Sequence, residues 1–199
     1  MRVKPSRTTR RPPIALRLHK ADTQEPDRIL AACAGDEAAR DWIVRHYTPP
    51  IYRFCYRLLR NEQDARDVSQ ETLLRVLRNL HRYDPKHRFT TWAFTIARNA
   101  CIDLQRKRKR IGPWTDREVV DTAPSPLAQT QQRIRAERLE RALQELPDMY
   151  REILVLYHFE HLKYTEIAAV LDIPLGTVMN RIFRARRKLR VIYEDQEAS

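Results

Sequence analysis

Apolar residues recur at spacings of three and four along almost the whole chain, the pattern of amphipathic α-helices. Ile51, Phe54 and Leu58 belong to one such face, and the 199 residues include only 3 Gly. The pattern breaks most clearly at residues 111–132, where one Gly, three Pro and a net charge of −2 are typical of a linker. The sequence therefore predicts an all-α protein with two small helical domains joined by a flexible linker, at residues 26–110 and 133–190.

The chain is strongly basic, with a net charge of +12. A charge of this size favours a polyanionic partner, such as nucleic acid. Residues 1–25 hold seven Lys/Arg against two acids, which indicates a disordered basic arm. The same start superficially resembles an organelle transit peptide, and the basic arm is the preferred interpretation. Residues 191–199 are expected to form a tail.

The cysteines and histidines predict no metal or cofactor site. Cys33, Cys55 and Cys101 are far apart and have no metal or redox spacing, so we interpret them as small buried apolar residues in a reducing cytosol. The six His form no ligand cluster. No apolar run is long enough to span a bilayer, and no secretory leader follows the first basic residues. We expect a cytoplasmic protein without direct membrane insertion.

The stretch from Tyr164 to Arg190 predicts a helix-turn-helix. A first short helix has an inner face made of Ile167, Ala168, Val170 and Leu171. The sequence LDIP ends it, and a second helix begins near Pro174 or Leu175. Six of the ten residues from Arg181 to Arg190 are basic. A solvated helix in an ordinary bundle is the competing interpretation, and the basic residues after such a turn favour DNA.

The second helix of this pair offers two kinds of DNA contact. Asn180 and Arg184 lie four residues apart on one face, and these residue types suit adenine and guanine edges in the major groove. Arg186, Arg187 and Lys188 are expected to meet phosphates, which give affinity without sequence information. Met179 can make only apolar contact, for example with a thymine methyl group.

The first domain holds a mixed face and an aromatic, basic helix. Asp67, Gln70, Glu71, Leu74 and Arg75 share one helix face, which predicts a protein-docking surface. The next helix, Phe89 to Lys109, combines aromatic and basic residues, a mixture that suits single-stranded nucleic acid. We expect Asp64 to cap the first of these helices and Trp92 to lie in the core beside Ile96.

These segments resemble the second and fourth regions of bacterial RNA polymerase sigma factors, specifically the small extracytoplasmic-function (ECF) group. The D-x-x-Q-E-T/V-x-x-R pattern runs from Asp67 to Arg75, and F-x-x-W-x-x-x-I-A-x-N runs from Phe89 to Asn99. The stretch LQELPDMYREILVLYHFEHLKYTEIAAVLDIPLGTVMNRIFRARRKLR carries the fourth-region elements. Both modules occur in the family's order, which makes the resemblance specific.

The resemblance implies a protein that binds core RNA polymerase, recognises the minus-ten and minus-thirty-five promoter elements and directs initiation of a stress or signal regulon. The partners are the two largest polymerase subunits, promoter DNA in double-stranded and melted form, and an anti-sigma factor. The linker stands where larger relatives have a third region. No catalytic role is implied.

The resemblance also assigns residues to each surface. Core polymerase is expected to contact Asp67, Gln70, Glu71, Leu74 and Arg75. The minus-ten strand is expected to contact Tyr83, Lys86, His87, Arg88, Phe89, Asn99 and Arg106. The minus-thirty-five duplex is expected to contact Thr177, Met179, Asn180, Arg181, Phe183, Arg184 and Arg187.

Two positions depart from the family pattern. Met179 stands where many members carry Lys or Arg, and Asn180 where many carry Ser. The promoter preference is therefore expected to be this chain's own. The loop from Pro85 to Arg88, which in relatives encloses a flipped base, varies too widely to name that base.

Two other classes of protein remain as alternatives. A helix-turn-helix regulator acting without stable polymerase association needs a ligand or receiver domain, and residues 26–110 show no strand pattern and no phosphoacceptor loop. A recombinase or nuclease needs a nucleophile or a carboxylate metal site. Asp64 and Asp67 are three residues apart, but they open a helix, where capping explains them better.

Overall fold

The computed structural model describes residues 24–111 and 131–198, and within these ranges it contains helices and no strand. This confirms the all-α prediction. The basic arm up to residue 23 and most of the linker, residues 112–130, lie outside the described residues.

The first module comprises α1 (Glu25–Cys33), α2 (Glu37–Leu59), α3 (Glu62–Arg78), η1 (Leu80–Arg82) and α4 (Phe89–Ile111). The second comprises α5 (Gln131–Glu145), α6 (Asp148–Leu154), η2 (Val155–Phe159), α7 (Tyr164–Leu171) and α8 (Leu175–Ala198).

Short polar side chains define where the helices of the first module begin. Asp36 caps α2 by accepting a hydrogen bond from the Ala39 N–H at 2.7 Å. Asn61 caps α3 in the same way, accepting from the Asp64 N–H at 2.9 Å. The prediction that Asp64 is the cap is therefore wrong, because Asp64 lies in the first helical turn. Its carboxylate instead pairs with the Arg108 guanidinium of α4 at 2.5 Å.

Each module has an apolar interior made by its own helices. In the first, Phe54 of α2 meets Phe94 of α4 edge to face, with ring centroids 5.0 Å apart, and both rings are almost fully buried. Cys55 and Cys101 are buried nearby, as the sequence predicts, whereas Cys33, also predicted to be buried, is only half-buried. In the second module the buried side chains include Leu143, Leu146, Ile153, Leu154, Ile167, Val178 and Ile182.

Arg151 is the one charged side chain in the described core that is almost completely buried, at 2% exposed. Its guanidinium donates to the backbone oxygens of Gln144 and Leu146 at 3.2 and 3.1 Å and pairs with Asp148. These bonds satisfy carbonyl groups at the C-terminal end of α5, which otherwise lack helical partners. Arg151 thereby fixes the turn between α5 and α6.

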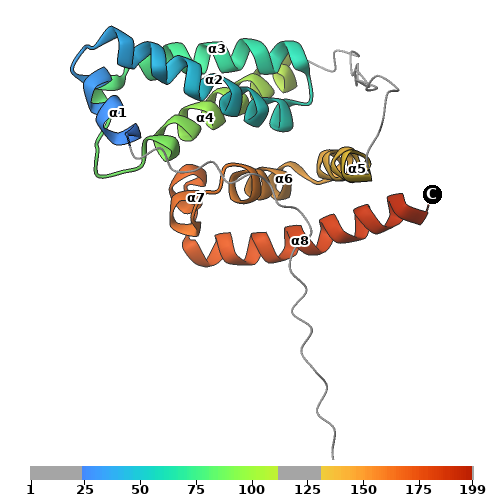
Figure 1. The fold of residues 1–199 in the computed structure, drawn as a ribbon. Helices are drawn as coiled ribbons and strands as arrows, with labels where there is room; N and C mark the ends of the chain where they lie inside the picture. The colour runs from blue at the N-terminus through green and yellow to red at the C-terminus, as the bar shows by residue number, and fades with distance from the viewer. Residues whose placement is uncertain (1–23, 112–130, 199) are drawn as a thin grey trace, which may run out of the picture.

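The two modules lie against each other, with α7 beside α4 and α6 beside α2 (Figure 1). Arg98 of α4 pairs with Glu152 of α6 at 2.6 Å, and Arg57 of α2 pairs with Glu140 of α5 at 3.1 Å. The Arg57 guanidinium also lies 3.9 Å from the centre of the Phe159 ring. Buried apolar residues continue across this contact as one cluster. The residues expected as a tail continue α8 to Ala198.

Candidate polymerase and nucleic-acid interfaces

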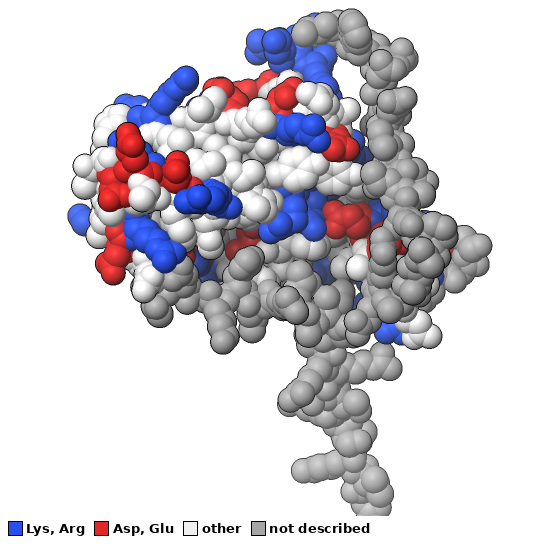
Figure 2. Space-filling model, turned by 45° about the horizontal axis from the view of Figure 1, so that its top comes forward, with Lys and Arg blue, Asp and Glu red and all other residues white. Residues whose placement is uncertain are grey.

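The face of α3 predicted to dock on a protein is exposed. Asp67, Gln70, Leu74 and Arg75 are all exposed, and Leu74 keeps 47% of its surface accessible. Glu71 is half-buried and pairs with Arg75 along the helix at 2.7 Å. On the side turned forward in Figure 2, acidic and basic side chains are interspersed around uncharged surface. This mixture of charges suits a protein partner better than a polyanion.

A groove of about 430 Å³ separates the C-terminal end of α3 from α4. It brings Asn99 together with Arg75, which the sequence assigned to the polymerase surface, and with other residues that the sequence did not assign to a site. Trp92 lines it and is half-buried, with its ring centroid 5.5 Å from Tyr83 and 5.4 Å from Phe89. Trp92 packs against the core beside Ile96, as expected, and the part of its side chain that stays accessible forms one wall of the groove. The groove is lined by Arg75, Asn79, Arg82, Trp92, Ile96 and Asn99.

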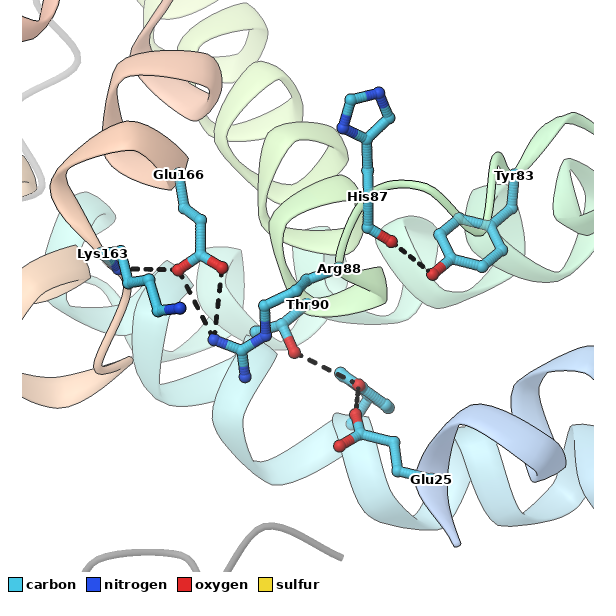
Figure 3. A network of polar contacts seen from close by, with 8 residues as sticks. Glu25, Tyr83, His87, Arg88, Thr90, Lys163 and Glu166 are labelled. Atoms are coloured by element: carbon cyan, nitrogen blue, oxygen red, sulfur yellow. Dashed lines mark hydrogen bonds and ion pairs between the residues drawn. The ribbon is translucent and has the colours of Figure 1, made fainter. Parts of the chain in front are cut away.

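The loop between η1 and α4 is held in shape by its own polar groups. The Lys86 N–H donates to the Asp84 carboxylate at 2.9 Å. The Tyr83 hydroxyl donates to the His87 carbonyl at 2.6 Å (Figure 3). Lys86, His87 and Arg88 are exposed on this loop. These bonds fix the loop through its backbone and Tyr83, without using the side chains of Lys86 and His87.

Phe89 does not join the exposed loop residues. Its side chain is only 3% exposed, and its ring lies 5.0 Å from Tyr47 and 5.2 Å from Tyr83. The prediction that Phe89 contacts the minus-ten strand is therefore wrong, because the ring supports the loop from beneath. Burial also raises the pKa of the Tyr47 phenol, which bonds Glu25 and lies 3.4 Å from the Thr90 hydroxyl (Figure 3). Arg106 is exposed two turns beyond Asn99 on α4.

Arg88 connects the loop to the second module. Its guanidinium lies 3.4 Å from a carboxylate oxygen of Glu166, which is on α7 (Figure 3). The same Glu166 accepts the Lys163 N–H at 2.7 Å, a bond that satisfies an unpaired donor at the start of α7. An expected minus-ten residue is thus bound, in the described arrangement, to the helix-turn-helix.

The helix-turn-helix forms as the sequence predicts. Asp172 adopts a left-handed conformation, with φ of 52°, and ends α7. Val178, Ile182 and Ala185 of α8 are buried against the module. The opposite side of α8 is accessible: Met179 is 50% and Phe183 is 70% exposed, and Asn180, Arg184 and Arg187 are exposed. Thr177 and Arg181 are half-buried at its edge.

The three basic residues expected to meet phosphates differ in their contacts. Arg186 stacks on Tyr157 at 4.9 Å, and its Nε donates to His158 Nε2 at 3.4 Å. Burial, together with the charges of Arg186 and His161, lowers the pKa of His158 to about 4, so the ring accepts this bond as a neutral imidazole. Arg186 is therefore turned towards its own module. Arg184, Arg187 and Lys188 all line a second groove, of about 540 Å³, between α8 and Tyr150.

The mixed-charge face of α3 and the exposed, basic side of α8 thus indicate a two-module, helical DNA-binding protein. Comparisons with known proteins identify the family within this class. The model of sigma-70 region 2 matches residues 43–111, and the model of sigma-70 region 4 matches residues 136–189. The chain is 35% identical over 175 residues to the ECF RNA polymerase sigma factor SigW of Bacillus subtilis, covering 82% of this chain and 93% of the relative.

A second relative, the ECF RNA polymerase sigma factor SigE of Mycolicibacterium smegmatis, is 39% identical over 163 residues, or 78% of this chain and 63% of SigE. Among solved structures, the sigma factor RpoE in complex with the anti-sigma factor NepR from Bartonella quintana shares the fold. Its TM-score is 0.66, with 23% identity over 77% of this chain and 96% of that one. The chain belongs to the ECF RNA polymerase sigma factors, which direct promoter recognition by the polymerase and are not enzymes.

No helix in residues 24–111 and 131–198 combines the length and apolar character needed to cross a membrane. Within the same ranges, no three His, Cys, Asp or Glu side chains gather as a metal site would require.

Proposed function

We propose that this sigma factor uses three surfaces during initiation, two of which meet at Arg75 of α3. The exposed face of α3 docks on core polymerase, the groove between α3 and α4 holds the melted minus-ten strand, and the exposed side of α8 reads the minus-thirty-five duplex. The observation that carries this proposal is that one groove is lined by an exposed amide, Asn99, and a half-buried indole, Trp92. No catalytic group is needed to explain this pairing.

The groove suits unpaired bases for a physical reason. A base outside a duplex can stack on an aromatic ring, which contributes roughly 1–3 kcal/mol per base, and its edge remains free for hydrogen bonding. Trp92 offers the ring, Asn99 offers a donor and an acceptor, and Arg82 offers charge for the backbone. Tyr83, Lys86, His87 and Arg88 extend the same surface along the loop, and Arg106 extends it along α4.

On α8, we assign different roles to residues on one exposed side. Asn180 and Arg184 make hydrogen bonds to base edges, whereas Arg187 meets phosphates. Arg184→Ala should change base preference at one or two minus-thirty-five positions. Arg187→Ala should weaken all sequences alike and flatten the salt dependence. Initiation from a randomised minus-thirty-five library separates the two results. If Arg184→Ala lowered initiation equally at all promoter variants, Arg184 would be a phosphate contact and not a base contact.

Binding both elements requires the modules to part. Elements centred 25 base pairs apart are separated by roughly 85 Å at 3.4 Å per base pair. The modules are in direct contact, and Arg88 of the minus-ten loop is bound to Glu166 of the helix-turn-helix. The chain between Ile111 and Gln131 can bridge roughly 65 Å when fully extended. We therefore expect the contact between modules to break when the holoenzyme binds a promoter.

We also propose an anti-sigma factor as a partner, acting on the chain in the bacterial cytoplasm. A relative of the same fold was solved as a sigma factor with its anti-sigma factor. A protein that holds the two modules together would keep the minus-ten and minus-thirty-five surfaces from reaching their elements at once. Such a partner would inhibit without covering either DNA surface.

The test is transcription by purified core polymerase supplemented with this chain. We expect transcripts that begin at defined promoters, and permanganate-reactive thymines in the melted minus-ten strand. Asn99→Ala should reduce open-complex formation roughly 2- to 10-fold, the loss of one hydrogen-bonding contact. Asp103→Ala is the matched control, because Asp103 is exposed one turn further along α4. Equal reactivity for both variants would remove Asn99 from the minus-ten site.

A further inference from the structure

Three arginines form a stripe along the C-terminal half of α2. Arg53, Arg57 and Arg60 are separated by four and three residues, which places them on one side of the helix. Residues 42–61 contain no Asp or Glu, so the helix supplies no acid of its own to this stripe. The docking face of α3 is different, because it mixes acids, an amide and a leucine with one arginine. A row with a single sign of charge suits a polyanion.

The second module supplies the negative groups that meet this stripe. The Arg57 guanidinium lies 3.1 Å from the Glu140 carboxylate. The Arg60 guanidinium donates to the Leu146 carbonyl at 3.1 Å, directly after α5, where the end of a helix carries partial negative charge. Burial raises the pKa of Glu160 to about 7, and the charges of two arginines of the stripe act in the opposite direction. The stripe is therefore neutralised while the modules are in contact.

Parting of the modules takes these negative groups away. Arg57 is only 13% exposed in its pair, and a poorly solvated guanidinium that loses its carboxylate costs free energy unless another anion replaces it. On a promoter, the duplex between the minus-ten and minus-thirty-five elements lies between the parted modules. This duplex carries one negative charge per roughly 1.7 Å of its axis. The face that opens thus turns towards a dense row of anions.

We propose that the stripe of Arg53, Arg57 and Arg60 binds phosphates of the promoter duplex between the two elements, and that acidic groups of the second module occupy this site until the modules part. The inference rests on the proposed parting of the modules. The stripe spans seven residues, a helical rise of about 10 Å, over which one strand presents about three phosphates. The promoter and the second module then compete for one face of α2.

The test treats the two partners of one ion pair differently. Holoenzyme is assembled with saturating core polymerase, and its affinity for a promoter that it transcribes is measured by fluorescence anisotropy at several salt concentrations. Glu140→Gln removes the competing anion and should raise the affinity roughly 2- to 5-fold. In that background, Arg57→Gln removes only the phosphate contact, so the affinity should fall roughly 2- to 10-fold. The slope of log affinity against log salt should become shallower by about 0.9.

A second ion pair and an altered DNA serve as controls. Glu62→Gln, alone and with Arg66→Gln, repeats the design on an exposed pair within α3 and should leave affinity and slope unchanged. Neutral methylphosphonates can replace the phosphates in the half of the spacer nearest the minus-ten element. They should flatten the salt slope of the Glu140→Gln holoenzyme, and flatten it by one contact less when Arg57 is also replaced.

The outcomes separate this inference from the function on which it rests. If Glu140→Gln and the double variant raise the affinity equally and share one slope, the ion pair only clasps the modules and the proposal is wrong. If Arg57→Gln leaves the slope unchanged and weakens assembly with core polymerase, the stripe contacts protein and the proposal is also wrong. If the unaltered holoenzyme transcribes no promoter, the proposed function fails and this inference falls with it.

Discussion

The interiors of the two modules and the surface between them are built differently. Inside a module, side chains such as Phe54 and Leu154 are fully buried among apolar neighbours. The surface between modules adds partly exposed ion pairs to its apolar contact, at Arg98–Glu152, Arg57–Glu140 and Arg88–Glu166. Apolar burial depends little on salt, whereas ion pairs near the surface are weakened by it. Each module is therefore a stable unit, and the contact between them is the part that can open.

The largest loss of stability is expected inside a module. Phe54→Ala removes a fully buried ring that packs against Phe94, which should lower the free energy of unfolding by roughly 3–5 kcal/mol. Leu74→Ala, on the exposed face of α3, should change it by less than about 0.5 kcal/mol. Urea unfolding followed by circular dichroism measures both values. Similar losses for the two variants would contradict the core assigned to α2 and α4.

A smaller effect is expected between the modules. Arg98→Ala leaves the Glu152 carboxylate without its partner, at a site where burial already raises the pKa of Glu152. The free energy that holds the two modules together should fall by roughly 1–3 kcal/mol. Small-angle scattering should show a larger radius of gyration with unchanged helicity, most clearly in high salt. Arg66→Ala, which removes an exposed pair within α3, is the control and should leave the radius unchanged.

The surface between modules should also respond to pH through Glu160. Burial raises the pKa of Glu160 to about 7, against the lowering effect of Arg57 and Arg53 on α2. A carboxyl group whose pKa is raised on folding stabilises the folded state when it is protonated. This stabilisation is fully present below the unfolded pKa near 4.5 and is lost as pH rises through the folded pKa of about 7. Glu160→Gln resembles the protonated form. It should raise the melting temperature at pH 8 by roughly 2–4 °C and change it little at pH 5.

The control for this pH prediction is Glu194→Gln, which alters an exposed carboxylate near the end of α8. Its melting temperature should track that of the unaltered protein at both pH values. A gain for Glu160→Gln that is equal at pH 5 and pH 8 would show that the titration of Glu160 is not the cause.

A small effect on the fold is also expected for a charge reversal on the α3 surface. Glu71→Lys breaks an exposed pair with Arg75, which should cost less than about 1 kcal/mol of stability. The same change places a positive charge on the proposed docking face and should weaken binding to core polymerase. Native helicity with unchanged affinity for core polymerase would exclude this face, and Glu62→Lys, at the start of α3, tests whether any charge reversal on the helix has the same result.

Local patterns were readable from the sequence, and long-range contacts were not. The helical periodicity gave the all-α fold. The turn after Leu171 predicted a helix start near Pro174 or Leu175, and α8 begins at Leu175. That Asn99 lies near Trp92 could be predicted from the sequence, because the two residues are seven apart on one helix, and both line the groove. Each of these follows from residues within a few turns of one another.

The errors have a common physical origin. Asp64 was interpreted as a cap because its partner Arg108, 44 residues away, is invisible to local spacing, and Asn61 was the better-placed cap. Phe89 was assigned to DNA because a periodicity does not reveal that Tyr47 and Tyr83 cover its ring. Arg186 was counted with the phosphate contacts because its neighbour Tyr157 lies on another helix.

The most direct test holds the two modules together. Cysteines replace Arg98 and Glu152 in a Cys33→Ser background, and a short bifunctional methanethiosulfonate reagent links them through bonds that a reductant reverses. With core polymerase and a promoter carrying both elements, the linked protein should fail to initiate, and adding dithiothreitol should restore transcripts. Single-cysteine variants treated in the same way should stay active. Full initiation by the linked protein would show that the modules need not part, and would contradict the proposal that each reads its own promoter element.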